Sequence, residues 1–376
     1  MKFTWFHLMP WPHMPDDFRQ KHRSVWVDLP SSMYEPELGH IAYHQYLDQL
    51  EYAEKVGFDG IGVNEHHANA YGLMPSPNIM AATLTRRTSK AALVVLGNSI
   101  ALYNPPLRVA EEMAMLDVLS GGRLIAGFPV GTSMDTNYAY GTIPALTREK
   151  YAEAHDLIRK AWAADQPFAF NGRYTKLRYV NCWPKPVQRP APPIFIPGGG
   201  SVETYDFCLD NTYSYSYLSY SGYLRAKLLM EGYWKRVAER KVDESPYRAG
   251  FADAPGYRTV KTIQTGALSQ FTQASVRNYP SMSWKDLTEG RYVVAGSPDT
   301  VRQQMEELIK TLRVGNVFCL LHMGNMPDDK VRHSTKLFAE KVIPHLRNLW
   351  PDWNNHDDRF WCHPMHEPVP TRVAAE

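Results

Sequence analysis

Residues 58–67 read F-D-G-I-G-V-N-E-H-H, and this stretch decides the fold. The helical pattern that precedes it stops at Gly57, a residue suited to the left-handed backbone conformation that ends many helices. Residues 61–63 then form a short apolar run, and the polar group N-E-H-H, residues 64–67, follows at its end. Polar side chains delivered at the end of a buried strand are typical of the reactive face of a parallel barrel.

The same alternation of strand and helix patterns continues over most of the chain. Consecutive strand–helix units indicate parallel strands joined by right-handed crossovers. The expected strands lie at 2–8, 61–63, 92–96, 123–128, 194–196, 212–219, 259–267 and 317–321, and the expected helices at 41–57, 77–88, 107–120, 147–163, after Ser201, 224–240, 301–312 and 336–346. This pattern predicts an α/β fold, the (β/α)8 TIM barrel.

The barrel is expected to occupy residues 1–347, followed by a C-terminal extension at 348–376. Insertions are expected at about 9–40, 165–192 and 275–291, where the barrel pattern is interrupted. Within the second insertion, the dipeptide Asn171-Gly172 predicts a tight β-hairpin.

Composition excludes several classes of function. The 41 Lys and Arg nearly balance the 39 Asp and Glu, and they form no concentrated basic patch, so neither a nucleic-acid surface nor a membrane anchor is expected. The four cysteines are far apart and form no zinc-binding spacing, which favours a reduced, cytoplasmic setting. The apolar N-terminus is broken by Pro10 and Pro12, so we interpret it as a first strand and not as a signal peptide.

Residues 64–67 are the first candidate site. A single histidine here could act as an acid, a base or a hydrogen-bond donor, with the adjacent carboxylate fixing its tautomer. An equally open interpretation is a strand end whose polar residues only satisfy nearby backbone groups. A metal site is disfavoured because no third ligand with a recognisable spacing accompanies the two histidines.

The second candidate site is the glycine run Gly198-Gly199-Gly200, which stands between a strand and a helix that Ser201 could cap. Glycines let backbone N–H groups approach a phosphate, and the start of a helix adds partial positive charge. A plain turn is the alternative, and the position between strand and helix favours phosphate binding. Separately, the aromatic residues Trp5 and Tyr217 could line a pocket for a flat ring, although core packing explains each of them as well.

Together these motifs resemble the bacterial luciferase-like family of flavin-dependent monooxygenases. The matching segments are M-K-F at the start, G-F-D-G-I-G-V-N-E-H-H, L-R-V-A-E-E-M-A-M-L-D-V-L-S-G-G-R-L-I-A-G, P-P-I-F-I-P-G-G-G-S-V-E-T, V-A-G-S-P-D-T-V-R-Q-Q-M and L-F-A-E-K-V-I-P-H-L, in this order from residue 1 to about 347.

The resemblance implies a cofactor and its binding residues. The cofactor would be reduced FMN, supplied by a separate flavin reductase and reacting with O2 to a C4a-peroxyflavin. His66 matches the family's active-site histidine. The turn at Asn98, Ser99 and Ile100 would lie along the isoalloxazine ring, where the family often has a non-prolyl cis peptide, and Gly198, Gly199, Gly200, Ser201 and Val202 would hold the phosphate. A substrate pocket would include Trp5, Met9, Glu65 and Tyr217, and a homodimer is expected.

Two departures from the family pattern bear on the phosphate site. Val130 stands where luciferase has a phosphate-binding arginine, and Gly199 and Val202 replace the hydroxyl residues of its phosphate loop. Flavin binding would therefore depend on backbone donors and Ser201, and we expect it to be weak.

These features predict an FMN-dependent monooxygenase that acts on a small to medium, largely apolar organic molecule. One alternative is an F420-dependent dehydrogenase or reductase on the same fold, although no Lys or Arg cluster for the acidic tail of F420 is evident. A second alternative is a non-catalytic flavoprotein subunit.

Overall fold

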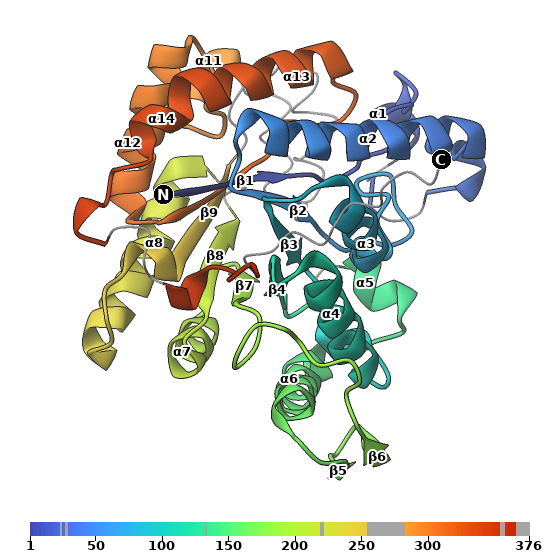
Figure 1. Cartoon of the computed structure of the whole chain (residues 1–376). Helices are drawn as coiled ribbons and strands as arrows, with labels where there is room; N and C mark the ends of the chain where they lie inside the picture. Colours follow the sequence, from blue (N-terminus) through green and yellow to red (C-terminus); the bar gives the residue numbers. More distant parts are fainter. Residues whose placement is uncertain are drawn as a thin grey trace, which may run out of the picture.

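Eight parallel strands close into a barrel in the computed structural model, which describes residues 1–22, 25–26, 29–131, 134–218, 222–253, 283–353 and 358–365 (Figure 1). The barrel order is β1-β10-β9-β8-β7-β4-β3-β2. The strands are β1 (Lys2–Phe6), β2 (Gly60–Val63), β3 (Ala92–Leu96), β4 (Leu124–Gly127), β7 (Ile194–Gly198), β8 (Ser214–Leu218), β9 (Ala249–Asp253) and β10 (Asn316–Cys319). The (β/α)8 prediction is confirmed.

Helices surround the barrel (Figure 1). The longer ones are α2 (Pro36–Val56), α3 (Pro77–Arg87), α4 (Leu107–Ser120), α6 (Thr147–Ala163), α7 (Val202–Asn211), α8 (Gly222–Arg240), α12 (Pro298–Leu312) and α13 (Asp328–Leu337), which continues through a π-helical turn at Phe338–Val342 into α14 (Ile343–Leu346). Short helices are α1 (Phe18–Lys21), α5 (Met134–Ala139) and α11 (Trp284–Glu289).

Two glycines of the deciding stretch make room inside the barrel. A Cβ on Gly60 would lie 2.7 Å from the hydroxyl of Thr4, and a Cβ on Gly62 would lie 2.8 Å from the ring of Phe6. The side chains of Thr4 and Phe6 on the neighbouring strand β1 therefore fill the interior beside β2, because glycine leaves that face of β2 empty. Ile61 and Val63 point the other way and are buried in the outer core under the helices.

Two element boundaries differ from the sequence prediction. The seventh barrel strand is β9, Ala249–Asp253, and not the expected segment 259–267, which lies outside the described residues. Helix α2 begins at Pro36 and not at residue 41, because proline is favourable in the first turn, where no backbone N–H is needed. The first insertion therefore ends before this helix. Gly57 ends α2 with φ of 102°, as predicted.

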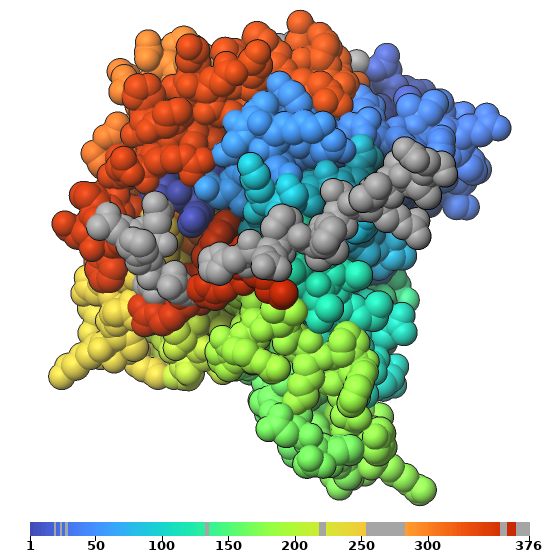
Figure 2. All heavy atoms as spheres, in the orientation of Figure 1, coloured from blue at the N-terminus to red at the C-terminus, as the bar shows by residue number. Residues whose placement is uncertain are grey.

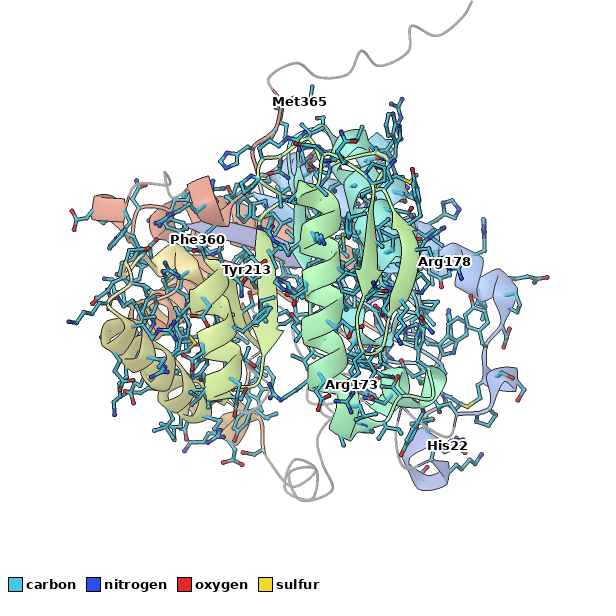
Figure 3. The ribbon with its side chains drawn as sticks, turned by 90° about the horizontal axis from the view of Figure 1, so that it is seen from below. His22, Arg173, Arg178, Tyr213, Phe360 and Met365 are labelled. Atoms are coloured by element: carbon cyan, nitrogen blue, oxygen red, sulfur yellow. The ribbon has the colours of Figure 1, made fainter. Side chains whose placement is uncertain are left out.

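The second insertion carries the predicted hairpin, formed by β5 (Phe168–Asn171) and β6 (Lys176–Val180). It projects from the rest of the molecule (Figure 2), and its residue Arg173 lies beside the first turn of α6, where it donates to Glu149 (Figure 3). The carboxylate of Glu153 on α6 accepts hydrogen bonds from the backbone of residues 173–175, which fixes the turn against that helix.

The C-terminal extension crosses the end of the barrel where the strands begin. Cys362 is buried in the inner core, the N–H of His363 donates to Oε1 of Gln188 (2.8 Å), and the N–H of Met365 donates to the carbonyl of Gly121 (2.8 Å). Phe360 and Met365 mark this segment in Figure 3. The extension therefore covers the end of the barrel opposite to the strand ends that carry residues 64–67.

Among the described residues, no helix combines the length and apolar character that crossing a lipid bilayer requires.

Candidate active site

His66 follows β2 and is held by a buried carboxylate from another part of the chain. Oδ2 of Asp135 lies 3.0 Å from Nδ1 of His66, and it also accepts from the backbone N–H of His67 (3.1 Å) and from Nδ2 of Asn69 (3.0 Å). The side chain of Asp135 is fully buried, whereas that of His66 is 12% exposed. Because an ionised carboxylate only accepts hydrogen bonds, Nδ1 of His66 carries a proton, and in the neutral ring Nε2 is an acceptor.

Glu65 joins the end of β2 to the turn after β3. Its Oε2 accepts from the backbone N–H of Ser99 (3.1 Å), the hydroxyl of Tyr103 (3.1 Å) and Nδ2 of Asn98 (3.4 Å), while Oε1 lies 2.7 Å from Nε2 of His67. Burial, and then the Glu65 charge, raise the pKa of Tyr103 above its ordinary value. Glu65 and His67 therefore form a hydrogen-bonded pair beside His66, and the side chains of His66 and His67 are 12% and 10% exposed.

The turn expected to contact the flavin ring follows directly after β3. A non-prolyl cis peptide joins Leu96 to Gly97, immediately before Asn98. The backbone N–H of Asn98 donates to the carbonyl of Gly127 (3.0 Å), which binds the turn to the end of β4. Oδ1 of Asn98 is buried and has no hydrogen-bond partner within the described part of the chain, so it remains available as an acceptor.

The glycine run lies at the end of β7 and leads into α7. Gly200 has φ of 98°, and a Cβ there would also collide with Leu229, so only glycine fits. A Cβ on Gly199 would meet nothing within 4 Å, so the space beside it is open. Ser201 caps α7, and its Oγ accepts from the N–H of Thr204 (3.3 Å). A glycine turn at the start of a helix has the geometry of an anion-binding site.

Arg148 supplies a positive charge to this loop, and sequence reasoning missed it. Its Nη2 donates to Oγ of Ser201 (3.3 Å) from the first turn of α6. The position expected to carry such an arginine, Val130, lies instead just after β4. A guanidinium beside helix-terminal N–H groups fits a phosphate. The only signal in the sequence was a basic residue at a helix start, which is far too common to single out.

Three of the residues expected in the substrate pocket lie elsewhere. Trp5, Met9 and Tyr217 belong to the outer core, and the indole N–H of Trp5 donates to Oγ1 of Thr335 on α13 (3.0 Å). Trp5 and Tyr217 are therefore packed between strands and helices, and Met9, three residues beyond the end of β1, is fully buried. Glu65, the fourth expected residue, does lie beside His66, where it organises the turn after β3.

The rings next to His66 are instead those of Trp26 and Tyr71. The ring centroid of His66 lies 5.2 Å from that of Trp26 and 4.8 Å from that of Tyr71, and the two aromatic rings are 5.1 Å apart. Trp26 comes from the first insertion, which is tied to the loop after β2 by the N–H of Ala70 donating to the carbonyl of Val25 (3.0 Å). This insertion therefore covers the site.

Across the described residues, no three His, Cys, Asp or Glu side chains gather as ligands for a metal ion. The residues present do fit a flavin nucleotide, because the loop at Gly199 and Arg148 suits its phosphate and the buried acceptor of Asn98 suits a ring N–H.

A histidine–carboxylate pair and a glycine turn that leads into a helix both lie at the carboxyl ends of strands in a closed parallel barrel, which is where (β/α)8 proteins carry their functional sites. The chain belongs to the luciferase-like monooxygenase family, because the sequence model of that family matches residues 23–252. The resemblance inferred from the sequence motifs is thus confirmed.

The relatives with a named activity include monooxygenases. The chain is 26% identical over 171 residues to the oxygenase component of the flavin-dependent trigonelline monooxygenase of Acinetobacter baylyi, which is 45% of this chain and 46% of that protein. Four curated relatives are each matched over only 32% to 47% of their own length.

Solved structures share the fold. The oxygenating constituent of the 3,6-diketocamphane monooxygenase of Pseudomonas putida, in complex with FMN, has a TM-score of 0.71 at 15% identity, covering 92% of this chain and 98% of that chain. An F420-dependent secondary alcohol dehydrogenase has a TM-score of 0.67 at 19% identity, covering 92% and 99%. At these identities the likeness shows the fold alone.

Proposed function

We propose that this protein is the oxygenase component of a two-component monooxygenase, which uses reduced FMN and O2 to oxygenate a small to medium, largely apolar organic molecule. One observation carries the proposal: a histidine–carboxylate pair and a phosphate-binding turn lie at the same end of one barrel. The name of the trigonelline enzyme, an oxygenase component, supports a separate flavin reductase as partner. The FMN complex of the diketocamphane enzyme supports FMN as the cofactor.

The phosphate would be held by the backbone of Gly199 to Val202, the hydroxyl of Ser201 and the guanidinium of Arg148. Asn98 would offer its buried Oδ1 to a ring N–H of the flavin. When bound, reduced FMN supplies the two electrons that activate oxygen.

His66 would move the proton that this chemistry requires. Its Nε2 accepts a proton in the neutral state and returns it in the charged state, and the carboxylate of Asp135 stabilises the charged ring. The rings of Trp26 and Tyr71 limit the access of water to His66, which suppresses the unproductive loss of reducing equivalents to solvent.

A homodimer is the assembly we propose, on the basis of an exposed apolar face. Met115, Val118 and Leu119 on α4 and Ile79 on α3 are all exposed, although α3 and α4 pack together. Large exposed apolar side chains on neighbouring helices are typical of an interface between protein chains. Replacing Leu119 with glutamate and measuring the mass in solution tests this assignment, which a monomeric wild type would refute.

An F420-dependent dehydrogenase is the second candidate, and the shared fold with the secondary alcohol dehydrogenase supports it. A non-catalytic flavoprotein subunit is the third. The pairing of His66 with Asp135 favours catalysis, because a carboxylate beside a histidine fixes the tautomer of the ring and stabilises its charged form during proton transfer.

The deciding experiment is an anaerobic titration with reduced FMN, followed by rapid mixing with oxygen. We expect saturable binding and a transient absorbance band before oxidised FMN appears. Binding of reduced F420 without binding of reduced FMN would overturn the proposal. His66→Ala tests the third candidate: an unchanged time course in a folded variant would show that His66 takes no part.

A further inference from the structure

We propose that Trp26, Tyr71 and His66 form the surface that recognises the substrate, that this surface takes a planar ring of neutral or positive charge, and that Trp26 determines this specificity. The proposal rests on the proposed function, and we call these three residues the aromatic corner.

The geometry of the aromatic corner suits a flat ligand. The Trp26 ring is tilted by 58° to the ring of His66, and the Tyr71 ring stands at 83° to it. Rings at such angles present faces and edges on different sides, and a planar guest can stack on one ring while meeting the edge of another. The side chain of His66 is 12% exposed and Trp26 is half-buried, whereas Tyr71 is only 3% exposed. A ligand would therefore contact Trp26 and the exposed part of His66, and Tyr71 would support both rings from behind.

The polar groups behind the corner are predominantly acceptors. The carboxylates of Glu65 and Asp135 are buried, with side chains 1% and 0% exposed. The carboxylate of Glu65 has four hydrogen-bond partners, and none of them is a Lys or Arg side chain. They are the imidazole of His67, the hydroxyl of Tyr103, the amide of Asn98 and the backbone N–H of Ser99. Next to it, Oδ1 of Asn64 is buried without a hydrogen-bond partner among the described residues, and it adds another acceptor.

The negative charge of Glu65 also affects the neighbouring side chain of Tyr140. Burial, followed by the charge of Glu65, raises the pKa of Tyr140, whose ring centroid lies 5.0 Å from that of His67. A negative potential beside aromatic faces attracts a cation and repels a carboxylate, because the face of an indole or phenol ring is itself negative. Both desolvation and this repulsion would therefore weaken the binding of an anionic substrate.

The test compares three ligands of one shape at pH 8: N-methylquinolinium, 4-methylquinoline and quinoline-4-carboxylate. Their affinities are measured by calorimetry under anaerobic conditions, with the protein saturated with reduced FMN. We expect the cation and the neutral ring to bind on the order of tenfold or more tightly than the carboxylate. Equal or tighter binding of the carboxylate would overturn the proposal.

Variants then assign the effect to Trp26. Trp26→Ala is expected to weaken binding of the cation on the order of tenfold, whereas Trp26→Phe, which keeps an aromatic face, should stay within a few-fold. Trp183→Ala is the matched control, because Trp183 is 84% exposed on the second insertion. Equal effects of Trp26→Ala and Trp183→Ala would refute the role of Trp26.

Binding of reduced FMN is measured separately for each protein. If the wild type binds no reduced FMN, the proposed function fails, and the three ligands are then compared on the flavin-free protein. A preference for the cation there would still support the aromatic corner, and its absence would refute it.

Discussion

Replacing Asp135 with asparagine removes the charge that fixes the tautomer of His66 and leaves the local fold intact. The asparagine Oδ1 can still accept from the N–H of His67 and from Asn69, the other two donors that meet Oδ2 of Asp135. What is lost is the charge-assisted bond at Nδ1 of His66, 3.0 Å long in the native protein. Hydrogen bonds to charged groups contribute about 1.5–3 kcal/mol, which corresponds to about 10- to 150-fold in an equilibrium or a rate.

Nitrogen-15 NMR of the imidazole rings measures this loss directly and needs no substrate. In the wild type, at a pH where His66 is neutral, we expect Nδ1 to carry the proton and Nε2 to be unprotonated. In Asp135→Asn both tautomers of His66 should be populated. The rate constant for oxidation of bound reduced FMN should change by about 10- to 150-fold. The affinity for reduced FMN should stay within a few-fold, because the hydrogen bonds of Asp135 described above go to the loop after β2.

Asp156→Asn is the matched control, because the Asp156 side chain is 76% exposed on α6. A wild-type His66 that carries its proton on Nε2 would refute the reasoning, and so would an Asp135→Asn variant that behaves like the control in both measurements.

Three further predictions concern the glycine turn and the pH dependence of stability. Arg148→Ala should lower the affinity for reduced FMN on the order of tenfold in a binding titration. Arg173→Ala is the control, because the Arg173 side chain is exposed. Gly200→Ala should lower the free energy of unfolding by about 1 kcal/mol or more, because φ is positive there, whereas Gly199→Ala should not. Burial, and to a smaller degree a neighbouring imidazole, lower the pKa of His7 well below 6.5, so Tm should fall as the pH drops below about 6.5 and should fall less in His7→Gln.

The sign of the pH effect follows from proton uptake. Below its ordinary pKa the imidazole of His7 binds a proton in the unfolded chain but stays neutral in the native state, so acid favours unfolding. Equal pH slopes of Tm in the wild type and in His7→Gln would contradict this assignment. For the glycine turn, equal stability of the two alanine variants, or unchanged FMN affinity in Arg148→Ala, would contradict the corresponding prediction.

The parts of the fold that sequence predicted are those determined by local chemistry. Gly57 ends a helix because glycine tolerates positive φ, and Ser201 begins a helix because its hydroxyl accepts a helix N–H. These signals, together with the apolar runs between them, place residues 64–67 and the glycine turn at strand ends. The seventh strand was misplaced because A-G-F-A-D carries few β-branched residues and little apolar length.

The residues that complete the site could not be predicted because their partners are distant in the sequence. Asp135 lies 69 positions after His66, and Arg148 lies 53 positions before Ser201. The periodicity and spacing of residues in the sequence do not indicate which carboxylate forms a hydrogen bond with which imidazole. Trp5 and Tyr217 had two interpretations, pocket and core, which the sequence does not separate. Alternate residues of a strand face opposite sides, and the pairing of distant strands decides which side meets the helices.

The two ends of the barrel divide stability from chemistry. At the end where the strands begin, the C-terminal extension buries Cys362 against the inner core. Its backbone N–H groups donate to the side chain of Gln188 and to the carbonyl of Gly121, and these contacts stabilise the fold. At the other end, buried carboxylates cost desolvation energy and are retained for the geometry that they impose on His66. Substitutions of Asp135 or Trp26 should therefore alter binding and proton transfer more than they alter unfolding, because the packed core lies below them.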